Sequence, residues 1–519
     1  MGGGIAQIIM KIVGMIFGEV GSGDFNFFVA RDAAIQRGEY VKVKHELYGW
    51  VLAKVGEIKR YNETYSLNVI TGVSIPKAGV EEHIIASARV IGYIDEREIL
   101  KTPKMPFKPG ENVYEADAGI IKRTLKLGNT SGIYLGILDG HKENIPVYLN
   151  PNKLVQKHVS VLAKTGAGKS YTVGVLIEEL IENNVPVVII DPHGEYSSLK
   201  NHNDIPKELN LMERFGIKPK AYKNIVEYST QMNINPQCDK KLTLDITRMN
   251  YGNFLDILPI KLSNVQEGLL YQALNVVKSY GRYTLEDIIR VLDEDDSKSK
   301  YRLITNLEIL RDSKIFEGKP VKTSELVRKG IVSIINLRGV APEIQDIIVS
   351  RLSTEVFEDR KLGRIPPLFF LVEEAHNFAP ERGFGSMAST KVFRTIASEG
   401  RKFGLGLCVV TQRPARIDKS VLSQCNTQII LKVTNPNDMR AISQSIESFT
   451  PELEDEIKQL EPGKALIVGE AVEQPIFVEV RVKRTKHGGG SIDLVRKTKK
   501  KDKTTGGLEG LLKKLFSRY

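Results

Sequence analysis

The stretch AKTGAGKS, residues 163–170, decides the fold of this chain. It follows the apolar run HVSVLA at 158–163 and precedes a helical pattern from Ser170 to Asn183. Gly166 and Gly168 let such a loop curl until its backbone N–H groups point at phosphate oxygens. The dipole of the following helix adds to this anion site. The pattern therefore predicts a phosphate-binding loop that opens a P-loop NTPase domain.

The loop departs from the usual pattern only at its first position, where Ala163 stands in place of glycine. In loops of this kind the lysine, here Lys169, reaches the β- and γ-phosphates, and the hydroxyl of the next residue, Ser170, ligates Mg²⁺. We therefore expect ATP and Mg²⁺ as cofactors. The residues expected to contact the nucleotide are Thr165, Gly166, Ala167, Gly168, Lys169, Ser170 and Tyr171.

An acidic pair ends the apolar run in PPLFFLVEEAHNF, residues 366–378. Buried paired acids are costly unless they hold a metal or polarise water. We expect Glu373 to bind Mg²⁺ through water and Glu374 to activate the attacking water. The alternative is that the two acids are exposed and begin a loop.

Two further motifs carry candidate catalytic residues. In DPHGEY (191–196), Asp191 ends a strand beside the site and could orient water or Mg²⁺, or could only form a turn. In EGRKFGLGLCVVTQRP (399–414), Gln412 ends an apolar strand and could sense the γ-phosphate. Charge that develops on that phosphate needs a cation, often from a neighbouring subunit. Arg401 is the candidate arginine finger, with a surface salt bridge as the alternative.

The fold class expected is α/β, with a RecA-like core at 151–470 that contains a helical insertion at about 200–325. Apolar strands alternating with helical segments are typical of a parallel sheet buried on both faces. In the insertion, 262–278 and 285–292 show apolar residues at helical spacing. The expected strands are 158–163, 185–191, 330–337, 368–374, 406–412 and 427–433.

Short apolar runs separated by polar turns precede this core and predict an all-β barrel at 14–150, after an N-terminal extension at 1–13. The polar segment 62–80 is expected to be a mobile loop. The apolar stretch 5–20 is too short to cross a bilayer and is interrupted by polar residues. No membrane association is therefore expected.

The net charge of +11 belongs almost entirely to the C-terminal end. From Arg481 onward the chain holds 13 basic and 3 acidic residues, against 61 and 60 in the first 480. The segment 487–519 is expected to be a flexible basic tail with an amphipathic helix, which could dock on a protein or contact DNA or a membrane surface. Only three cysteines are present, far apart, which fits a cytoplasmic protein.

Five motifs, in this order, resemble the HerA group of the HerA/FtsK superfamily: LAKTGAGKS, IDPHGEY, EEAHNFAPE, EGRKFGLGL and TQRPARID. The resemblance extends to about residue 485. It implies a HAS-barrel at 14–150, a C-terminal brace at 471–486, and a homo-hexamer that pumps double-stranded DNA through its channel. It further implies DNA-end resection with a NurA-type nuclease that docks on the barrel end, and contact with the recombination exonuclease complex.

The resemblance also implies roles for particular residues. Glu374 matches the catalytic glutamate of the family, and Asp191, Gln412 and Arg401 match further active-site positions. Lys157 matches a cation that reaches the nucleotide of a neighbour, although many members have arginine, whose bidentate fork lysine lacks. The brace, through Lys483 and Arg484, is expected to fold over the nucleotide.

The expected DNA contacts lie in a Gly- and Ser-rich segment at 380–394, after the acidic pair, which we interpret as a pore loop, with an ordinary surface loop as the alternative. Its cations Arg382, Lys391 and Arg394 would be repeated around a ring and would neutralise phosphates without reading sequence.

Two other functions share the motor core. One is a secretion or conjugation ATPase acting at a membrane, and the other is a nucleotide-gated DNA clamp that does not translocate.

Overall fold

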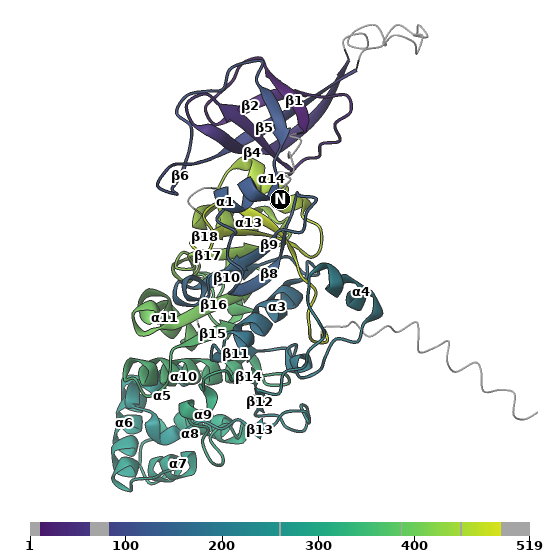
Figure 1. Ribbon diagram of the computed structural model, residues 1–519. Coiled ribbons are helices and arrows are strands. Elements are labelled where there is room, and N and C mark those ends of the chain that lie inside the picture. The colour runs from purple at the N-terminus through teal and green to yellow at the C-terminus, as the bar shows by residue number, and fades with distance from the viewer. Residues whose placement is uncertain (1–10, 63–81, 259–260, 386, 447–448, 489–519) are drawn as a thin grey trace, which may run out of the picture.

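The computed structural model describes residues 11–62, 82–258, 261–385, 387–446 and 449–488. Three parts follow one another along the molecule: a small β-barrel, a large sheet with helices on both faces, and a group of helices at the end far from the barrel (Figure 1). The expectations for residues 1–10, for the loop at 63–81 and for the tail at 489–519 lie outside the described residues.

The barrel is a closed ring of six antiparallel strands in the order β2-β1-β7-β3-β4-β5, closed by pairing of β2 with β5. Its strands alternate between the core and the solvent, so that Phe25 and Phe27 of β2 point inward. The strands are β1 (Ile12–Phe17), β2 (Asp24–Val29), β3 (Tyr40–His45), β4 (Gly49–Asn62), β5 (Glu82–Ile94) and β7 (Asn112–Glu115), with the short β6 (Leu100–Lys101) beside β5. The predicted N-terminal barrel is confirmed.

The barrel ends earlier than the sequence suggested. After the helix α1 (Ala118–Thr124), the strands β8 (Ile133–Leu138) and β9 (Pro146–Leu149) join the large sheet instead, where β8 pairs with β19 (Ile476–Val480). All six residues of β8 are buried, as is typical of a strand covered on both faces. The expected boundary at residue 150 was therefore wrong for these two strands.

The large sheet has the order β13-β12-β14-β11-β15-β16-β10-β17-β18-β19-β8-β9. It is parallel from β13 to β17 and antiparallel from β17 to β9. Its other strands are β10 (Val159–Leu162), β11 (Val187–Asp191), β12 (Ile225–Ser229), β13 (Lys240–Lys241), β14 (Val332–Asn336), β15 (Leu368–Val372), β16 (Leu405–Thr411), β17 (Thr427–Ile430) and β18 (Lys464–Gly469). All six strands expected in the core are present.

Alternate residues of the central strands face two separate hydrophobic cores. In β11, Val187 and Ile189 pack with the helix α3 (Lys169–Glu182), and Val188 and Ile190 pack on the side of α10 (Pro342–Lys361) and α11 (Ala388–Phe403). A parallel sheet covered on both faces needs such continuously apolar strands. The remaining helices around this sheet are α2 (Pro151–Gln156), α12 (Lys419–Leu422), α13 (Pro436–Ser445) and α14 (Pro451–Gln459).

The expected helical insertion is present, but it also contains two strands that were not predicted from the sequence. The strand β12 pairs in parallel with β14, and the two-residue β13 pairs with β12. The helices α6 and α7 each begin at a capping box, with Ser263 and Thr284 at the N-cap. The helices of this part are α4 (Pro206–Arg214), α5 (Tyr251–Ile257), α6 (Asn264–Ser279), α7 (Leu285–Asp293), α8 (Lys300–Asp312) and α9 (Thr323–Leu326).

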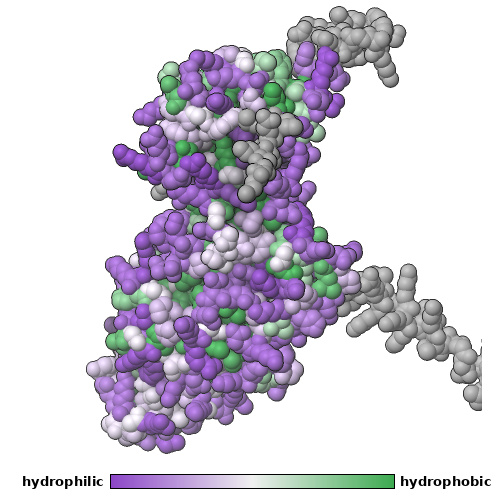
Figure 2. Space-filling model, viewed as in Figure 1, coloured by the Kyte–Doolittle hydropathy of each residue, from purple (hydrophilic) through white to green (hydrophobic). Residues whose placement is uncertain are grey.

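The barrel contacts the C-terminal part of the large domain. Lys54 of β4 forms an ion pair with Glu456 of α14 at 2.8 Å, and its ammonium lies 4.0 Å from the centre of the Phe477 ring. The face shown in Figure 2 is mostly hydrophilic, with hydrophobic residues in small separate patches. No helix among the described residues is long and apolar enough to cross a bilayer.

Candidate nucleotide site

The phosphate loop lies between the end of β10 and the start of α3, as the sequence predicted. Gly166 (φ 78°) and Gly168 (φ 95°) both have left-handed backbones, which favour glycine. A side chain at Gly166 would meet nothing within 4 Å, so the loop is open on that side. Ala163 is fully buried in the core, and its N–H donates to Thr411 O at 3.3 Å. Alanine at the first position therefore fits this loop.

The loop lysine contacts both members of the acidic pair. Lys169 Nζ lies 2.6 Å from Glu373 Oε1 and 2.6 Å from Glu374 Oε1. Burial alone would lower the pKa of Lys169, but the two carboxylates outweigh it and raise this pKa. The group as a whole carries two acids for one base in a buried place, so a further cation or a proton would stabilise it.

The two acids have different surroundings. Glu373 is 1% exposed; its Oε2 accepts a hydrogen bond from Tyr196 at 3.2 Å, and burial raises its pKa to about 7. Glu374 has a left-handed backbone (φ 48°, ψ 45°), which is uncommon for a residue with a side chain. Its Oε2 is buried and has no hydrogen-bond partner among the described residues. An unpaired buried carboxylate oxygen is suited to receive a polar group of a ligand or a water.

One side chain that was not predicted from the sequence, His376, lies beside Glu374, and a second, Thr411, contacts His376. His376 Nδ1 lies 3.3 Å from Glu374 Oε2 and 2.9 Å from Thr411 Oγ1. Burial lowers the pKa of His376, which favours a neutral imidazole. Gln412, the next residue after Thr411, accepts a hydrogen bond from the Thr165 hydroxyl of the phosphate loop. The expected position of Gln412 at the loop is therefore observed.

Asp191 lies at the carboxyl end of β11 and is fully buried. Its carboxylate accepts hydrogen bonds from the backbone N–H groups of His193 (3.2 Å), Gly194 (2.8 Å) and Tyr196 (3.2 Å). Burial raises its pKa to about 7. In this structure the carboxylate acts as a turn former, which the sequence left open as an alternative to orienting water or Mg²⁺.

Lys157 and Arg401 lie at the opposite edge of the sheet from the phosphate loop. Lys157 precedes β10 and pairs with Glu470, and Arg401 lies near the end of α11, before β16. The two segments meet at His158, whose Nε2 lies 3.1 Å from Ala397 O. The parallel strands run away from this edge toward the loop, so neither cation reaches the phosphate loop of its own chain.

The comparisons with known proteins match this architecture. The family described as "Helicase HerA, central domain" matches residues 133–356, and the family described as "HAS barrel domain" matches residues 13–96. A DNA double-strand break repair helicase HerA from Sulfurisphaera tokodaii is 30% identical over 381 residues, which cover 71% of this chain and 73% of that protein. The chain belongs to the HerA family.

Other HerA relatives match over nearly the whole length. The DNA double-strand break repair helicase HerA of Pyrococcus furiosus is 28% identical over 525 residues, which cover 91% of this chain and 92% of that protein. Among solved structures, VirB4 of Thermoanaerobacter pseudethanolicus is similar with a TM-score of 0.50 and 16% identity, over 68% of this chain and 97% of that one. That likeness concerns the fold. As a member of the HerA family with an intact phosphate loop, the chain is an ATP hydrolase.

The C-terminal segment of this HerA-family chain runs along α3, the helix that begins at the phosphate loop. Lys483 is buried against Gly174; burial lowers its pKa to about 8, and its Nζ donates to Lys486 O at 3.2 Å. Arg484 forms an ion pair with Glu179. Both cations expected to contact the nucleotide are therefore held by α3 and by the segment itself.

Tyr171, in the first turn of α3, is bound by the same segment. Its hydroxyl donates to Glu208 Oε2 and accepts from Lys483 N, both at 2.8 Å, and the His487 ring lies 5.4 Å from its ring. The C-terminal segment thus reaches the first turn of the helix that follows the phosphate loop.

The expected DNA-contact segment at 380–394 is only partly a loop. Since α11 begins at Ala388, Lys391 and Arg394 lie on a helix. Arg394 pairs with the buried carboxylate of Asp418, with Nε at 2.9 Å from Oδ2, so it is a structural residue here. Arg382 and Lys391 are exposed. The exposed Phe384 lies between the left-handed Gly383 and Gly385.

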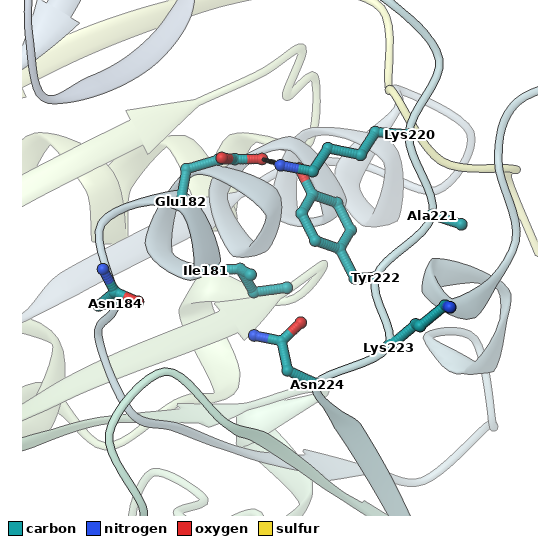
Figure 3. Close-up of a pocket in the computed structure, with 8 residues that line it drawn as sticks. All are labelled: Ile181, Glu182, Asn184, Lys220, Ala221, Tyr222, Lys223 and Asn224. Carbon is teal, nitrogen blue, oxygen red and sulfur yellow. Dashed lines mark hydrogen bonds and ion pairs between the residues drawn. The ribbon is translucent and has the colours of Figure 1, made fainter.

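A shallow pocket lies at the far end of α3, away from the phosphate loop (Figure 3). Glu182 accepts hydrogen bonds there from Lys220 Nζ and from the Tyr222 hydroxyl, both at 2.7 Å. None of the residues expected at the nucleotide site lines this pocket, so it is a separate feature. Its lining residues are Ile181, Glu182, Asn184, Lys220, Ala221, Tyr222, Lys223 and Asn224.

Proposed function

We propose that this chain is an ATP-driven translocase on double-stranded DNA that works as a ring-shaped homo-hexamer. Together with a NurA-type nuclease it would resect DNA ends in double-strand-break repair. One observation carries the proposal: the groups for hydrolysis lie at one edge of the parallel sheet, and the cations Lys157 and Arg401 lie at the other. Such a division suits subunits that complete one another's sites around a ring.

The residues at the phosphate loop fit ATP and Mg²⁺. The left-handed Gly166 leaves the loop open on one side, and Glu374 Oε2 is a buried acceptor with no hydrogen-bond partner among the described residues. Bound ATP and Mg²⁺ would supply the phosphoanhydride bond and the cation that polarises it. The loop amides and Lys169 would hold the phosphates, Ser170 and Glu373 would hold the metal, and Glu374 would polarise the attacking water.

Arg401 supplies the cation that hydrolysis needs, to the site of the adjacent subunit. It is exposed and forms no ion pair among the described residues, so it is free to bind an incoming phosphate group. Lys157 would assist from the same edge after it leaves Glu470. Lysine offers a point charge rather than the planar fork of arginine, so Arg401 is the main contributor.

DNA is held through its phosphates. Arg382 follows the acidic pair by eight residues and Lys391 lies in the first turns of α11, and both are exposed. One cation per subunit becomes six around a hexamer, and each phosphate contact adds to a salt-dependent affinity without sequence preference. The HerA relatives are named DNA double-strand break repair helicases, and these names support DNA as the substrate.

The barrel provides a surface for the nuclease. Ile12, Met15 and Phe28 of β1 and β2 are 46%, 50% and 40% exposed, and Phe28 stacks on Phe17 with ring centres 3.8 Å apart. Exposed apolar side chains grouped on one face often mark a protein interface. The three free cysteines, all buried, fit the cytoplasmic location that this function requires.

The experiment is the ATP turnover of the full chain with and without blunt duplex DNA, together with its mass under native conditions. We expect a hexamer whose turnover rises several-fold with duplex DNA and less with a single strand of equal length. A monomeric chain that hydrolyses ATP at the full rate would contradict the proposal. So would a hexamer whose ATP turnover does not change when duplex DNA is added.

A further inference from the structure

His376, a half-buried side chain beside Glu374, and Thr411, a buried side chain that contacts His376, have no role in the function proposed above. His376 Nδ1 lies 2.9 Å from Thr411 Oγ1 and 3.3 Å from Glu374 Oε2. The His376 side chain is 13% exposed and Thr411 is fully buried. They connect the end of β15, which carries the acidic pair, with the end of β16, which precedes Gln412. Buried polar groups linked in this way fix a particular geometry.

Thr411 is itself held by the phosphate loop and by the turn that carries Gln412. Its carbonyl oxygen accepts from Ala163 N at 3.3 Å, and its hydroxyl oxygen accepts from Arg413 N at 3.0 Å. The next side chain, Gln412, accepts from Thr165 of the loop. A shift of Gln412 would therefore move the Thr411 hydroxyl and, with it, the imidazole of His376.

Glu374 needs a second partner once the nucleotide occupies the loop. Its Oε1 is bonded to Lys169 at 2.6 Å, and Lys169 is the group that has to turn to the phosphates. Its left-handed backbone lies in a sparsely populated region, which persists only where the surroundings enforce it. Among the described residues, the other side chain within ion-pair distance of this carboxylate is His376, whose Nδ1 lies 3.3 Å from Oε2 and makes no hydrogen bond to it in this structure.

We propose that His376 and Thr411 are positioning residues for ATP hydrolysis. The imidazole holds the Glu374 carboxylate in place for the attacking water after Lys169 has left it. Thr411 fixes the orientation of the imidazole, and this orientation depends on the position of the end of β16, which Gln412 follows. Water activation is thereby coupled to contact between Gln412 and the nucleotide. This inference rests on the role proposed above for Glu374.

The test measures steady-state ATP turnover, ATP affinity and unfolding for variants of the full chain. His376→Ala lowers kcat by at least about 10-fold, since misplacing a reacting group by about 1 Å costs up to about 100-fold. KM for ATP and the unfolding midpoint change little. His376→Asn restores most of kcat, because its amide nitrogen can donate from nearly the place of Nδ1. His376→Gln, whose amide lies one methylene further out, stays low.

Thr411 offers a milder and independent variant. Thr411→Val keeps the shape of the side chain, removes the hydroxyl and lowers kcat several-fold, while Thr411→Ser keeps kcat near that of the unaltered chain. Combining His376→Ala with Thr411→Val costs no more than His376→Ala alone, because the hydroxyl acts only through the imidazole.

Several results would overturn the inference. One is a kcat of His376→Ala that equals that of the unaltered chain. Another is a loss of kcat in His376→Asn as large as that in His376→Ala. A third is a loss of kcat in the double variant that is the sum of the two single losses. Glu374→Gln separates this inference from its foundation. If Glu374→Gln keeps normal turnover, the proposed hydrolytic role fails as well. If it abolishes turnover while His376→Ala does not lower it, only the positioning role fails.

Discussion

Arg481 and Glu178 form an ion pair in which neither side chain has any exposed surface, with Nη1 of Arg481 2.8 Å from Oε2 of Glu178. A second nitrogen of the same guanidinium lies 2.8 Å from Glu179 Oε1. Since both acids lie on α3, this contact fastens the segment after β19 to the helix that starts at the phosphate loop. The C-terminal segment is thus part of the structure around the nucleotide site.

Replacing Arg481 should strongly destabilise the fold. Arg481→Met leaves Glu178 and Glu179 buried without their main cation, and removing one partner of a buried pair costs about 3–5 kcal/mol. Urea unfolding measures this loss. Arg214→Met is the matched control, since Arg214 makes a similar two-point contact with Glu479 at the surface and should lose at most about 1 kcal/mol. Equal losses in the two variants would argue against this account of the buried pair.

Stability of the nucleotide-free chain should depend on pH through Glu373. Burial raises the pKa of Glu373 from its ordinary 4.5 to about 7. The folded state therefore keeps a proton that the unfolded state releases, so this group costs stability as pH rises from 4.5 to 7. Glu373→Gln removes that cost. The variant should exceed the unaltered chain by up to about 3 kcal/mol at pH 8 and match it near pH 4.5.

Unfolding at pH 5, 6.5 and 8 measures this difference. The exposed Glu143→Gln serves as control and should show no such trend. A stability gain in Glu373→Gln that is the same at all three pH values would mean that protonation of Glu373 is not its source.

Arg401 should act on the site of the neighbouring subunit. Arg401→Ala and Glu374→Gln should each lose nearly all turnover as pure proteins. Mixed in equal amounts and reassembled, they should regain about a quarter of the normal turnover per subunit. A working site then needs an intact Glu374 on one subunit and an intact Arg401 on the next, and random mixing supplies both at about a quarter of interfaces. Mixtures that stay as inactive as their components would place Arg401 within its own subunit or outside the reaction.

The exposed cations after the acidic pair should contact DNA, whereas Arg394 should not. Arg382→Ala with Lys391→Ala should weaken DNA stimulation of turnover and reduce the salt dependence of duplex binding, by about 0.9 in the logarithmic slope for each phosphate that is no longer neutralised. Arg394→Ala should instead lower the unfolding midpoint, since it leaves the buried Asp418 unpaired. Unchanged DNA stimulation in the double variant would remove this segment from the DNA path.

The sequence identified the parallel strands because each is a continuous apolar run with a polar residue at its end. That property also brought Lys169, Glu373, Glu374 and Gln412 together, since the carboxyl ends of parallel strands share one edge. The strands β8 and β12 were misjudged for different reasons. An isolated apolar run such as β8 does not reveal which sheet it joins. The strand β12 carries the buried acid Glu227, which lowers its resemblance to a core strand.

Side-chain partners were harder to predict, because they depend on contacts between residues far apart in the sequence. Arg394 was expected to be free for DNA, yet Asp418, 24 residues further along, pairs with it. His376 stands two residues after Glu374, but its bond to Thr411 crosses 35 residues. A polar residue two positions after an acidic pair at a strand end was the one signal that could have pointed to His376.

ATP hydrolysis at Glu374 is proposed to drive movement along double-stranded DNA. Displacement of a third strand from a DNA triplex measures such movement without requiring strand separation of the duplex. We predict that the unaltered chain displaces the third strand only with ATP and Mg²⁺, and that Glu374→Gln binds ATP and duplex DNA but displaces nothing. Displacement by Glu374→Gln at the normal rate, or none by an ATP-hydrolysing unaltered chain, would contradict this claim.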